Sequence, residues 1–189
     1  MKTVTTRPMP SVARLGLHLT LSDFRHQSRT LRMLKTLLTE GVVDQIHVFA
    51  LAGDGLSSEE KVFQGAVVVH RVDVRVSRRI PGAMRHGIQY FAWVMAVLWK
   101  TRRFRPRLIQ CKNFEALPAA VAVSWITRSP LLYDASELES EKGNPRYPRW
   151  TAFRTRLIEH FCMRFVSRML VVSESIADWY QARYGIGRP

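Results

Sequence analysis

The sequence predicts an α/β fold, in which a doubly wound, mostly parallel sheet forms a single Rossmann-like domain. Short apolar segments with the composition of strands alternate along the chain with longer segments whose leucines and aromatic residues recur at helical spacing. Strands separated by helices form parallel sheets covered on both faces, and right-handed crossovers carry the chain back over the sheet. The length of 189 residues, of which 47% are hydrophobic, suits one domain with a full core.

The N-terminal part of the chain carries three predicted strands and one helix. The first strand lies at residues 12–19. Residues 27–40 have leucines at helical spacing, and the helix is expected to end at Gly41 because glycine adopts the backbone conformation that follows a helix. The second and third strands lie at 45–51 and 66–72, and the third is rich in β-branched residues.

The polar segment between the second and third strands, residues 54–60, is predicted to be a loop. The same alternation continues to the end of the chain, with strands at 107–111, 130–133 and 169–172 and helices at 81–103, 115–126, 149–167 and 173–184. The domain is therefore expected to cover residues 11–186. Residues 1–10 are expected to be a disordered N-terminal segment, and residues 187–189 the start of an interdomain linker.

The composition restricts the partners of the protein. There are 29 lysines and arginines against 15 aspartates and glutamates, which gives a net charge of +14 and favours an anionic partner. Nucleic acid is not expected as that partner, since the chain contains no helix-turn-helix, zinc-finger or RNA-binding signature. The two cysteines, Cys111 and Cys162, lie in separate apolar segments and are expected to be buried thiols rather than a disulfide.

Several common sites are absent from the sequence. It contains no G-x-G-x-x-G pattern, so a nicotinamide or flavin dinucleotide enzyme is not expected. It also contains no P-loop, no paired-cysteine zinc motif and no G-x-S-x-G elbow. We therefore expect neither a bound metal nor a cofactor.

An acidic segment, YDASELESEKG at residues 133–143, stands out in this basic chain. Two interpretations are open. The carboxylates could form a solvated loop that starts a helix, because acidic residues favour a first helical turn. Alternatively, Asp134 ends a strand, where loops face a ligand cleft, and the carboxylates could accept hydrogen bonds from hydroxyl groups of a sugar.

The string LLYDASELESE, at residues 131–141, resembles the Y-D-A-H-E-x-x-x-E segment of family 4 glycosyltransferases. Other pieces follow in the order of that family: DFR ahead of a helix with TLLTEG, then KNFEALPAA, then MLVVSESIADWYQARYG. The resemblance implies one half of a two-domain GT-B fold, namely the N-terminal domain that mainly holds the acceptor. The other domain of such an enzyme mainly binds the sugar nucleotide, so this chain alone is not expected to transfer sugar.

The resemblance also implies the site residues. Ser136 and Glu137 are the catalytic candidates, although Ser136 stands where the family commonly has a histidine and cannot carry a proton near neutral pH. The substrate-binding candidates all follow strands or lie in cleft loops, and they are Arg25, Lys112, Asn113, Asp134, Ser173 and Glu174. The expected partners are a nucleotide sugar, held mainly by the second domain, and a saccharide or lipid-linked acceptor.

The aromatic helix at 81–103 has basic residues before and after it. It could be a core helix with solvated ends, or it could lie in the interface of an anionic membrane. The longest apolar run, residues 87–99, is too short to span a bilayer, and no secretory signal is visible. The sequence thus predicts a cytoplasmic protein that could attach to the inner face of the cell membrane. The competing hypothesis is a non-catalytic basic module that docks on an anionic membrane or partner.

Overall fold

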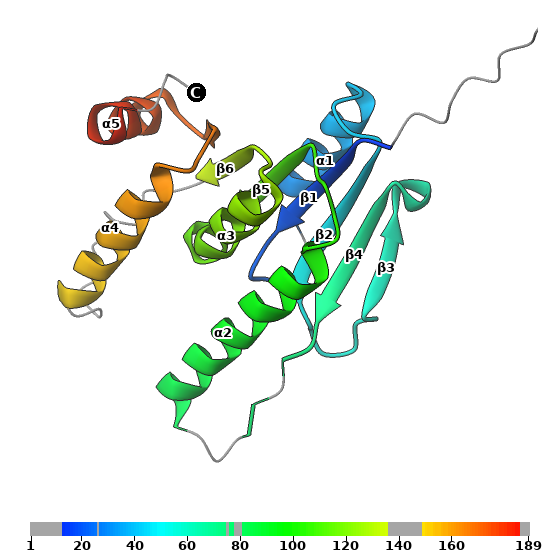
Figure 1. Ribbon diagram of the computed structural model, residues 1–189, viewed down its shortest axis with the longest axis horizontal. Coiled ribbons are helices and arrows are strands. Elements are labelled where there is room, and N and C mark those ends of the chain that lie inside the picture. Colours follow the sequence, from blue (N-terminus) through cyan, green and yellow to red (C-terminus); the bar gives the residue numbers. More distant parts are fainter. Residues whose placement is uncertain (1–12, 26, 75, 78–80, 136–148, 186–189) are drawn as a thin grey trace, which may run out of the picture.

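The computed structural model describes residues 13–25, 27–74, 76–77, 81–135 and 149–185. Its strands form one sheet with the order β3-β4-β2-β1-β5-β6-β7 (Figure 1). Six of them pair in parallel: β1 Leu15–Leu19, β2 Gln45–Leu51, β4 Val67–Val72, β5 Leu108–Lys112, β6 Leu131–Ala135 and β7 Arg168–Val171. This architecture confirms the predicted α/β, Rossmann-like fold.

The seventh strand corrects a prediction. Residues 54–60 were expected to form a loop, but β3 Glu59–Val62 begins inside that segment and pairs antiparallel with β4. The strand has no apolar alternation, because Glu59, Glu60 and Lys61 are all exposed at the edge of the sheet. Charged side chains are typical of edge strands, where they hinder pairing with another chain, and they conceal the strand from a search for hydrophobic pattern.

Among the described residues, five α-helices connect or follow the strands: α1 Ser28–Thr39, α2 Gly82–Thr101, α3 Leu117–Thr127, α4 Arg149–Met163 and α5 Glu174–Tyr184. Two short 3-10 turns lie at Phe63–Gly65 and Phe114–Ala116. Helix α4 ends four residues earlier than the predicted 149–167, because the chain turns at Phe165, whose N–H donates to the carbonyl of Cys162, to enter β7.

Two buried clusters show which helices cover which face. On one face, Leu34 of α1 packs with alternate residues of the strands, such as Ile46 and Val48. On the other face, Phe49 packs in a cluster with residues of α2, α3 and α4, including Trp93 and Cys162. Because successive side chains of a strand point to opposite faces, the neighbours Val48 and Phe49 belong to different clusters.

Helix α2 has one buried side and one exposed side, so the core interpretation holds for part of it and a place in the membrane interface stays a prediction. Trp93 is fully buried and Tyr90 is half-buried, so one side of the helix belongs to the core. Phe91 and Trp99 of the same helix are exposed. No helix in the described part of the chain is both long and apolar enough to cross a membrane.

The C-terminal helix is fixed to α4 by a buried carboxylate. Glu159 of α4 accepts hydrogen bonds from the hydroxyl groups of Tyr180 at 2.8 Å and Tyr184 at 3.1 Å, both on α5. Burial, followed by the negative charge of Glu159, raises the pKa of Tyr184 to about 12. The α4–α5 contact therefore holds β7 and the segment that follows it against the rest of the domain.

Candidate functional site

The candidate site lies along the carboxyl edge of the parallel strands, where ligands bind in open α/β sheets. The loops after β1, β2 and β5 and the ends of β4 and β6 meet there, and helix α1 begins beside them. Because β1 lies at the centre of the sheet between β2 and β5, the loop after β1 contacts both halves of this edge.

The most buried charged group at this edge is Asp134, at the end of β6. Its side chain is fully buried, and Oδ1 accepts a hydrogen bond from Nη2 of Arg29 at 2.8 Å. Burial raises the pKa of Asp134, while the positive charges of Arg29 and Lys112 oppose that rise. The second oxygen, Oδ2, meets no hydrogen-bond donor in the described part of the chain. A buried carboxylate oxygen of this kind can accept a hydroxyl hydrogen.

A chain of polar contacts connects the first loop to β5. The Ser22 hydroxyl lies 3.1 Å from the Thr20 hydroxyl and accepts a hydrogen bond from the Gln27 amide at 2.6 Å. The Gln27 amide oxygen in turn lies 3.3 Å from the ammonium of Lys112 and 3.0 Å from the hydroxyl of Thr30. Lys112 is thereby held beside the start of α1. It is also the residue of β5 that lies opposite Asp134 of β6, which pairs with Arg29.

Arg25 and Arg71 organise the loops on the other side of β1. Arg25 pairs with Asp23 at 3.3 Å and donates to the backbone carbonyl of Asp54. Arg71, on β4, is buried and donates to the backbone carbonyls of Asp23 at 3.1 Å and Ser57 at 3.0 Å, and to Glu60 at 2.6 Å. The loops after β1 and β2 are therefore held together by two guanidinium groups.

Gly53 shows how closely these two loops approach. A Cβ atom at this position would lie 2.9 Å from Cβ of Asp23 and 3.0 Å from Cδ1 of Leu56. Such distances are shorter than carbon atoms tolerate, so only glycine allows the loop after β2 to pass this close to the loop after β1.

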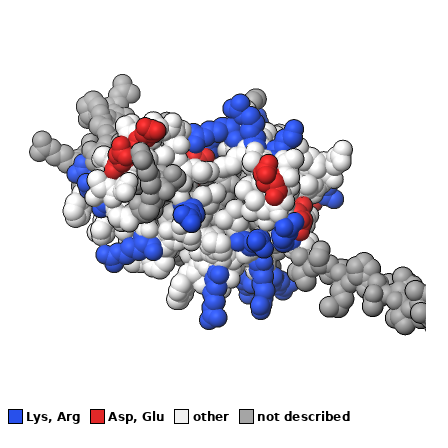
Figure 2. Space-filling view, turned by 90° about the horizontal axis from the view of Figure 1, so that it is seen from above, with Lys and Arg blue, Asp and Glu red and all other residues white. Residues whose placement is uncertain are grey.

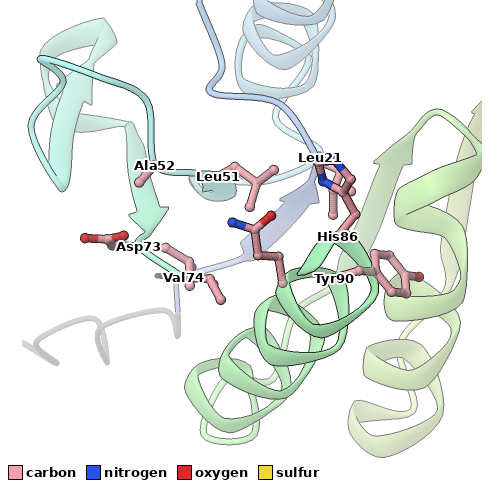
Figure 3. Close-up of a pocket in the computed structure, with 9 residues that line it drawn as sticks. Leu21, Leu51, Ala52, Asp73, Val74, His86 and Tyr90 are labelled. Atoms are coloured by element: carbon pink, nitrogen blue, oxygen red, sulfur yellow. The ribbon is translucent and has the colours of Figure 1, made fainter. Parts of the chain in front are cut away.

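A cavity of about 280 Å³ opens between the strand ends and the first turns of α2 (Figure 3). Leu21, Leu51 and Asp73 line it from the strands, and His86, Gln89 and Tyr90 line it from α2. A larger, more open hollow of about 860 Å³ continues past Asp73 to the loop after β2, and Gly53, Asp54, Arg71 and Arg85 line it. Apolar walls with a few polar groups are typical of sites for small polar ligands.

The structure does not bring all of the substrate-binding residues predicted from the sequence into one cluster. Asp134 and Lys112 lie with Arg29 and Gln27, while Arg25 is turned toward Asp54. Asn113 has a φ of 68°, an uncommon conformation for a residue other than glycine. The remaining candidates are treated below.

Ser173 caps α5, since its hydroxyl accepts a hydrogen bond from the N–H of Ile176 at 3.4 Å, and Glu174 is the exposed first residue of that helix. Ser136 and Glu137 lie outside the described residues. A substrate-binding role for Ser173 and Glu174 and a catalytic role for Ser136 and Glu137 stay predictions.

Sequence reasoning did not single out Arg29, Gln27 or Arg71. Arg29 and Gln27 lie within the predicted helix 27–40, where polar side chains are usually solvated, and their proximity to Asp134 and Lys112 depends on the order of strands in the sheet. In the described part of the chain, no three histidine, cysteine, aspartate or glutamate residues are grouped so as to hold a metal ion. The groups at this edge are instead suited to hydrogen-bonding hydroxyls and to neutralising an anion.

The model of the glycosyl transferase 4-like domain matches residues 26–189. Two structures of a sucrose-phosphate synthase from Thermosynechococcus elongatus are similar in fold. One has a TM-score of 0.63 at 10% identity, covering 90% of this chain and 82% of that chain, and the other has a TM-score of 0.63 at 12% identity, covering 93% and 46%. No curated protein sequence matches at a significant level.

A third similar structure is HepE of Anabaena, solved in complex with UDP and glucose, with a TM-score of 0.55 at 16% identity. The aligned region covers 93% of this chain and 42% of HepE, so the chain spans less than half the length of that protein. At these identities the structures show the fold, while the family model covers most of the chain. The chain belongs to the glycosyl transferase 4-like family, with the fold of the N-terminal half of a GT-B glycosyltransferase that its sequence resembles.

Proposed function

We propose that this domain holds the acceptor in an enzyme that moves a hexosyl group from a nucleotide sugar to a saccharide or lipid-linked acceptor. The observation that carries the proposal is the cavity at the carboxyl edge of the sheet, the same edge at which half-exposed Arg29 pairs with buried Asp134. Family membership supports the transferase activity. The complex of HepE with UDP and glucose supports a nucleotide sugar as the donor.

The described residues suggest a division of roles. His86, Gln89 and Asp73 offer donors and acceptors to acceptor hydroxyls inside the cavity. Arg29 and Lys112 supply positive charge near the Asp134 carboxylate, where an anionic group of donor or acceptor would be stabilised. Catalysis would then rest on placing donor and acceptor together between two domains, and Ser136 and Glu137 are the proposed catalytic residues.

The first prediction concerns the donor. The isolated chain should bind UDP-glucose weakly or not at all, because its loops offer no glycine-rich phosphate cradle. The same chain joined to a second GT-B domain should bind the nucleotide sugar and turn it over. Isothermal titration of both proteins, followed by initial rates, tests this. Tight binding of the nucleotide sugar by the isolated chain would show that the donor site lies in this half instead.

In the two-domain protein, Glu137→Ala should lower turnover at least about tenfold with little change in the melting temperature, because a carboxylate at a cleft rim positions substrate rather than supporting the core. Ser136→His should leave the rate unchanged or raise it. Glu40→Ala, at the end of α1, is the matched control and should change neither quantity. An unchanged rate in Glu137→Ala, or unfolding of that variant, would mean that residues 134–141 form a structural loop.

We further propose that the protein works in the cytoplasm, attached peripherally to the inner face of the cell membrane. Support comes from the net charge of +14 and from the exposed Phe91 and Trp99 on α2. Figure 2 shows lysine and arginine side chains standing out over much of one face, whereas aspartate and glutamate form a few separate patches. The same features would suit the second candidate, a non-catalytic module that docks on an anionic surface. Transfer of sugar by the two-domain protein would exclude that candidate.

The chain should accordingly sediment with vesicles that contain phosphatidylglycerol and should be released in about 1 M salt, where charges are screened beyond roughly 3 Å. Sedimentation followed by quantitative gel staining measures the bound fraction at each salt concentration. Equal binding to vesicles of pure phosphatidylcholine would contradict an electrostatic attachment.

A further inference from the structure

The helices α3 and α4 form an apolar groove that no part of the proposed catalytic site uses. The groove has a volume of about 870 Å³, and its walls include Trp125, Leu157, Phe161 and Phe165. These four side chains are exposed, and Trp125 retains 75% and Phe161 57% of its surface. Aromatic residues contribute most when they are buried, so this much exposed aromatic surface indicates a contact that the isolated chain does not make.

The groove continues a second exposed apolar surface on the same side of the sheet. Met84, Ile88, Phe91, Met95 and Trp99 recur at helical spacing along α2, and all five are exposed. Helix α3 packs against both α2 and α4, and all three helices contribute to one buried cluster under them (Figure 1). The outward sides of α2, α3 and α4 therefore belong to one helical layer, which we call the apolar face.

The charges around the apolar face are predominantly positive, and an exposed acidic residue, Glu115, lies directly before α3. The sequences of α2, α3 and α4 contain a single acidic residue, Glu159, and its carboxylate is buried between the hydroxyls of Tyr180 and Tyr184. The exposed basic residues on or next to the three helices are Lys100, Arg102, Arg103, Arg128, Arg154, Arg156 and Arg164. Arg102 lies over the ring of the exposed Trp99, with its guanidinium carbon 5.2 Å from the ring centroid.

The exposed apolar side chains and the cations around them together indicate which partner docks on the apolar face. A second copy of the chain would bring the same cations against these cations, so a symmetric dimer through the apolar face would be repelled. The surface of an anionic bilayer offers hydrocarbon to the aromatic side chains and negative headgroups to the cations at once, and each lysine or arginine near such a surface contributes about 1 kcal/mol. Aromatic residues with arginines around them are typical of helices that lie in that interface.

We propose that the whole apolar face, including the groove between α3 and α4, docks on an anionic lipid bilayer, so that three helices rather than α2 alone enter the interface. The inference rests on the proposed attachment to the membrane and specifies the surface that makes it. It also explains how a lipid-linked acceptor reaches the cavity. The first turns of α2 contribute His86, Gln89 and Tyr90 to the cavity wall, while the outward side of the same helix faces the lipid.

The test uses the chain with vesicles made of equal parts phosphatidylcholine and phosphatidylglycerol. The double variant Trp125→Glu/Phe161→Glu should bind these vesicles about tenfold more weakly, since two apolar side chains are withdrawn from lipid and two negative charges are added. Phe91→Glu on α2 should also weaken binding. The matched control is Val42→Glu, which replaces an exposed apolar residue after α1, on the opposite side of the sheet, and should carry only the effect of one added charge.

A second measurement does not depend on charge. Brominated lipid should quench tryptophan fluorescence of the wild-type chain, and Trp125→Phe should lose part of that quenching while keeping the vesicle affinity. Circular dichroism confirms that each variant is folded, as expected for substitutions at exposed positions.

The possible results separate the two proposals. If the wild-type chain binds no vesicles, both the membrane attachment and the docking face are wrong, whereas the transferase proposal is unaffected. If the wild-type chain binds and Phe91→Glu weakens binding, but the α3–α4 double variant binds like Val42→Glu, the groove is not a lipid contact and this inference is wrong. Sedimentation equilibrium that shows a dimer abolished by Trp125→Glu would assign the groove to a second copy and would also overturn it.

Discussion

Replacing Arg71 with methionine is expected to lower the free energy of unfolding by about 3 kcal/mol, because the buried guanidinium is lost from two backbone carbonyls and one carboxylate. The carbonyls of Asp23 and Ser57 lose their donor, and Glu60 loses its cation. The methionine side chain still fills the space. Glu60 is half exposed, so water compensates for part of its loss.

The same substitution should disturb the proposed acceptor site, since Arg71 lines the larger hollow and holds the loops after β1 and β2 together. In the two-domain enzyme the KM for the acceptor should rise. Chemical denaturation measures the stability, and initial rates at varied acceptor concentration measure the KM. Arg32→Met, at an exposed position on α1, is the control and should change neither. Equal stability of Arg71→Met and wild type would show that the loops are held by other contacts.

Most of the fold could be predicted because burial leaves a periodic signature in the sequence. The parallel strands β2, β4 and β5 are buried on both faces and appear as apolar runs, and α1 carries its leucines at helical spacing. Edge strand β3 gave no such signature, because its residues are polar and exposed. Helix α4 ends early because backbone hydrogen bonds form a turn at Phe165. Such a turn leaves no mark in the spacing of hydrophobic residues, so the sequence did not reveal it.

The location of the site could be predicted, but its contacts could not. The rule that ligands bind at the carboxyl ends of parallel strands predicts the edge of the sheet at which the cavity lies. The contact between Arg29 and Asp134 joins positions 105 residues apart and depends on β1 and β6 both flanking β5. Arg71 lies inside a strand, where a basic residue is usually solvated, and only the approach of two loops at Gly53 gives it three acceptors.

One buried group at the centre of the sheet makes the stability depend on pH. His18, on β1 opposite Gln110 of β5, is fully buried. Burial is the main cause that lowers the pKa of His18 from 6.5 to about 4. The neighbouring Gln110 side chain opposes that shift and the nearby positive charge of Lys112 adds to it, although neither ring nitrogen of His18 has a hydrogen-bond partner among the described residues. The imidazole is therefore neutral in the folded chain at neutral pH.

Lowering the pH from about 6.5 to about 4 is therefore expected to remove about 3 kcal/mol of stability through His18, since between these values the unfolded chain binds a proton that the folded chain does not. His18→Leu keeps a similar volume without an ionisable group, so its stability should fall about 3 kcal/mol less over the same interval. His47 and His70, whose pKa values are lowered mainly by burial, act in the same direction but are present in both proteins, so the difference isolates His18. Urea denaturation at several pH values measures the two slopes, with the exposed His160→Gln as the control. Parallel curves for wild type and His18→Leu would mean that His18 is protonated inside the fold, and that the polar groups of Gln110 and its neighbours around β1 stabilise a buried cation.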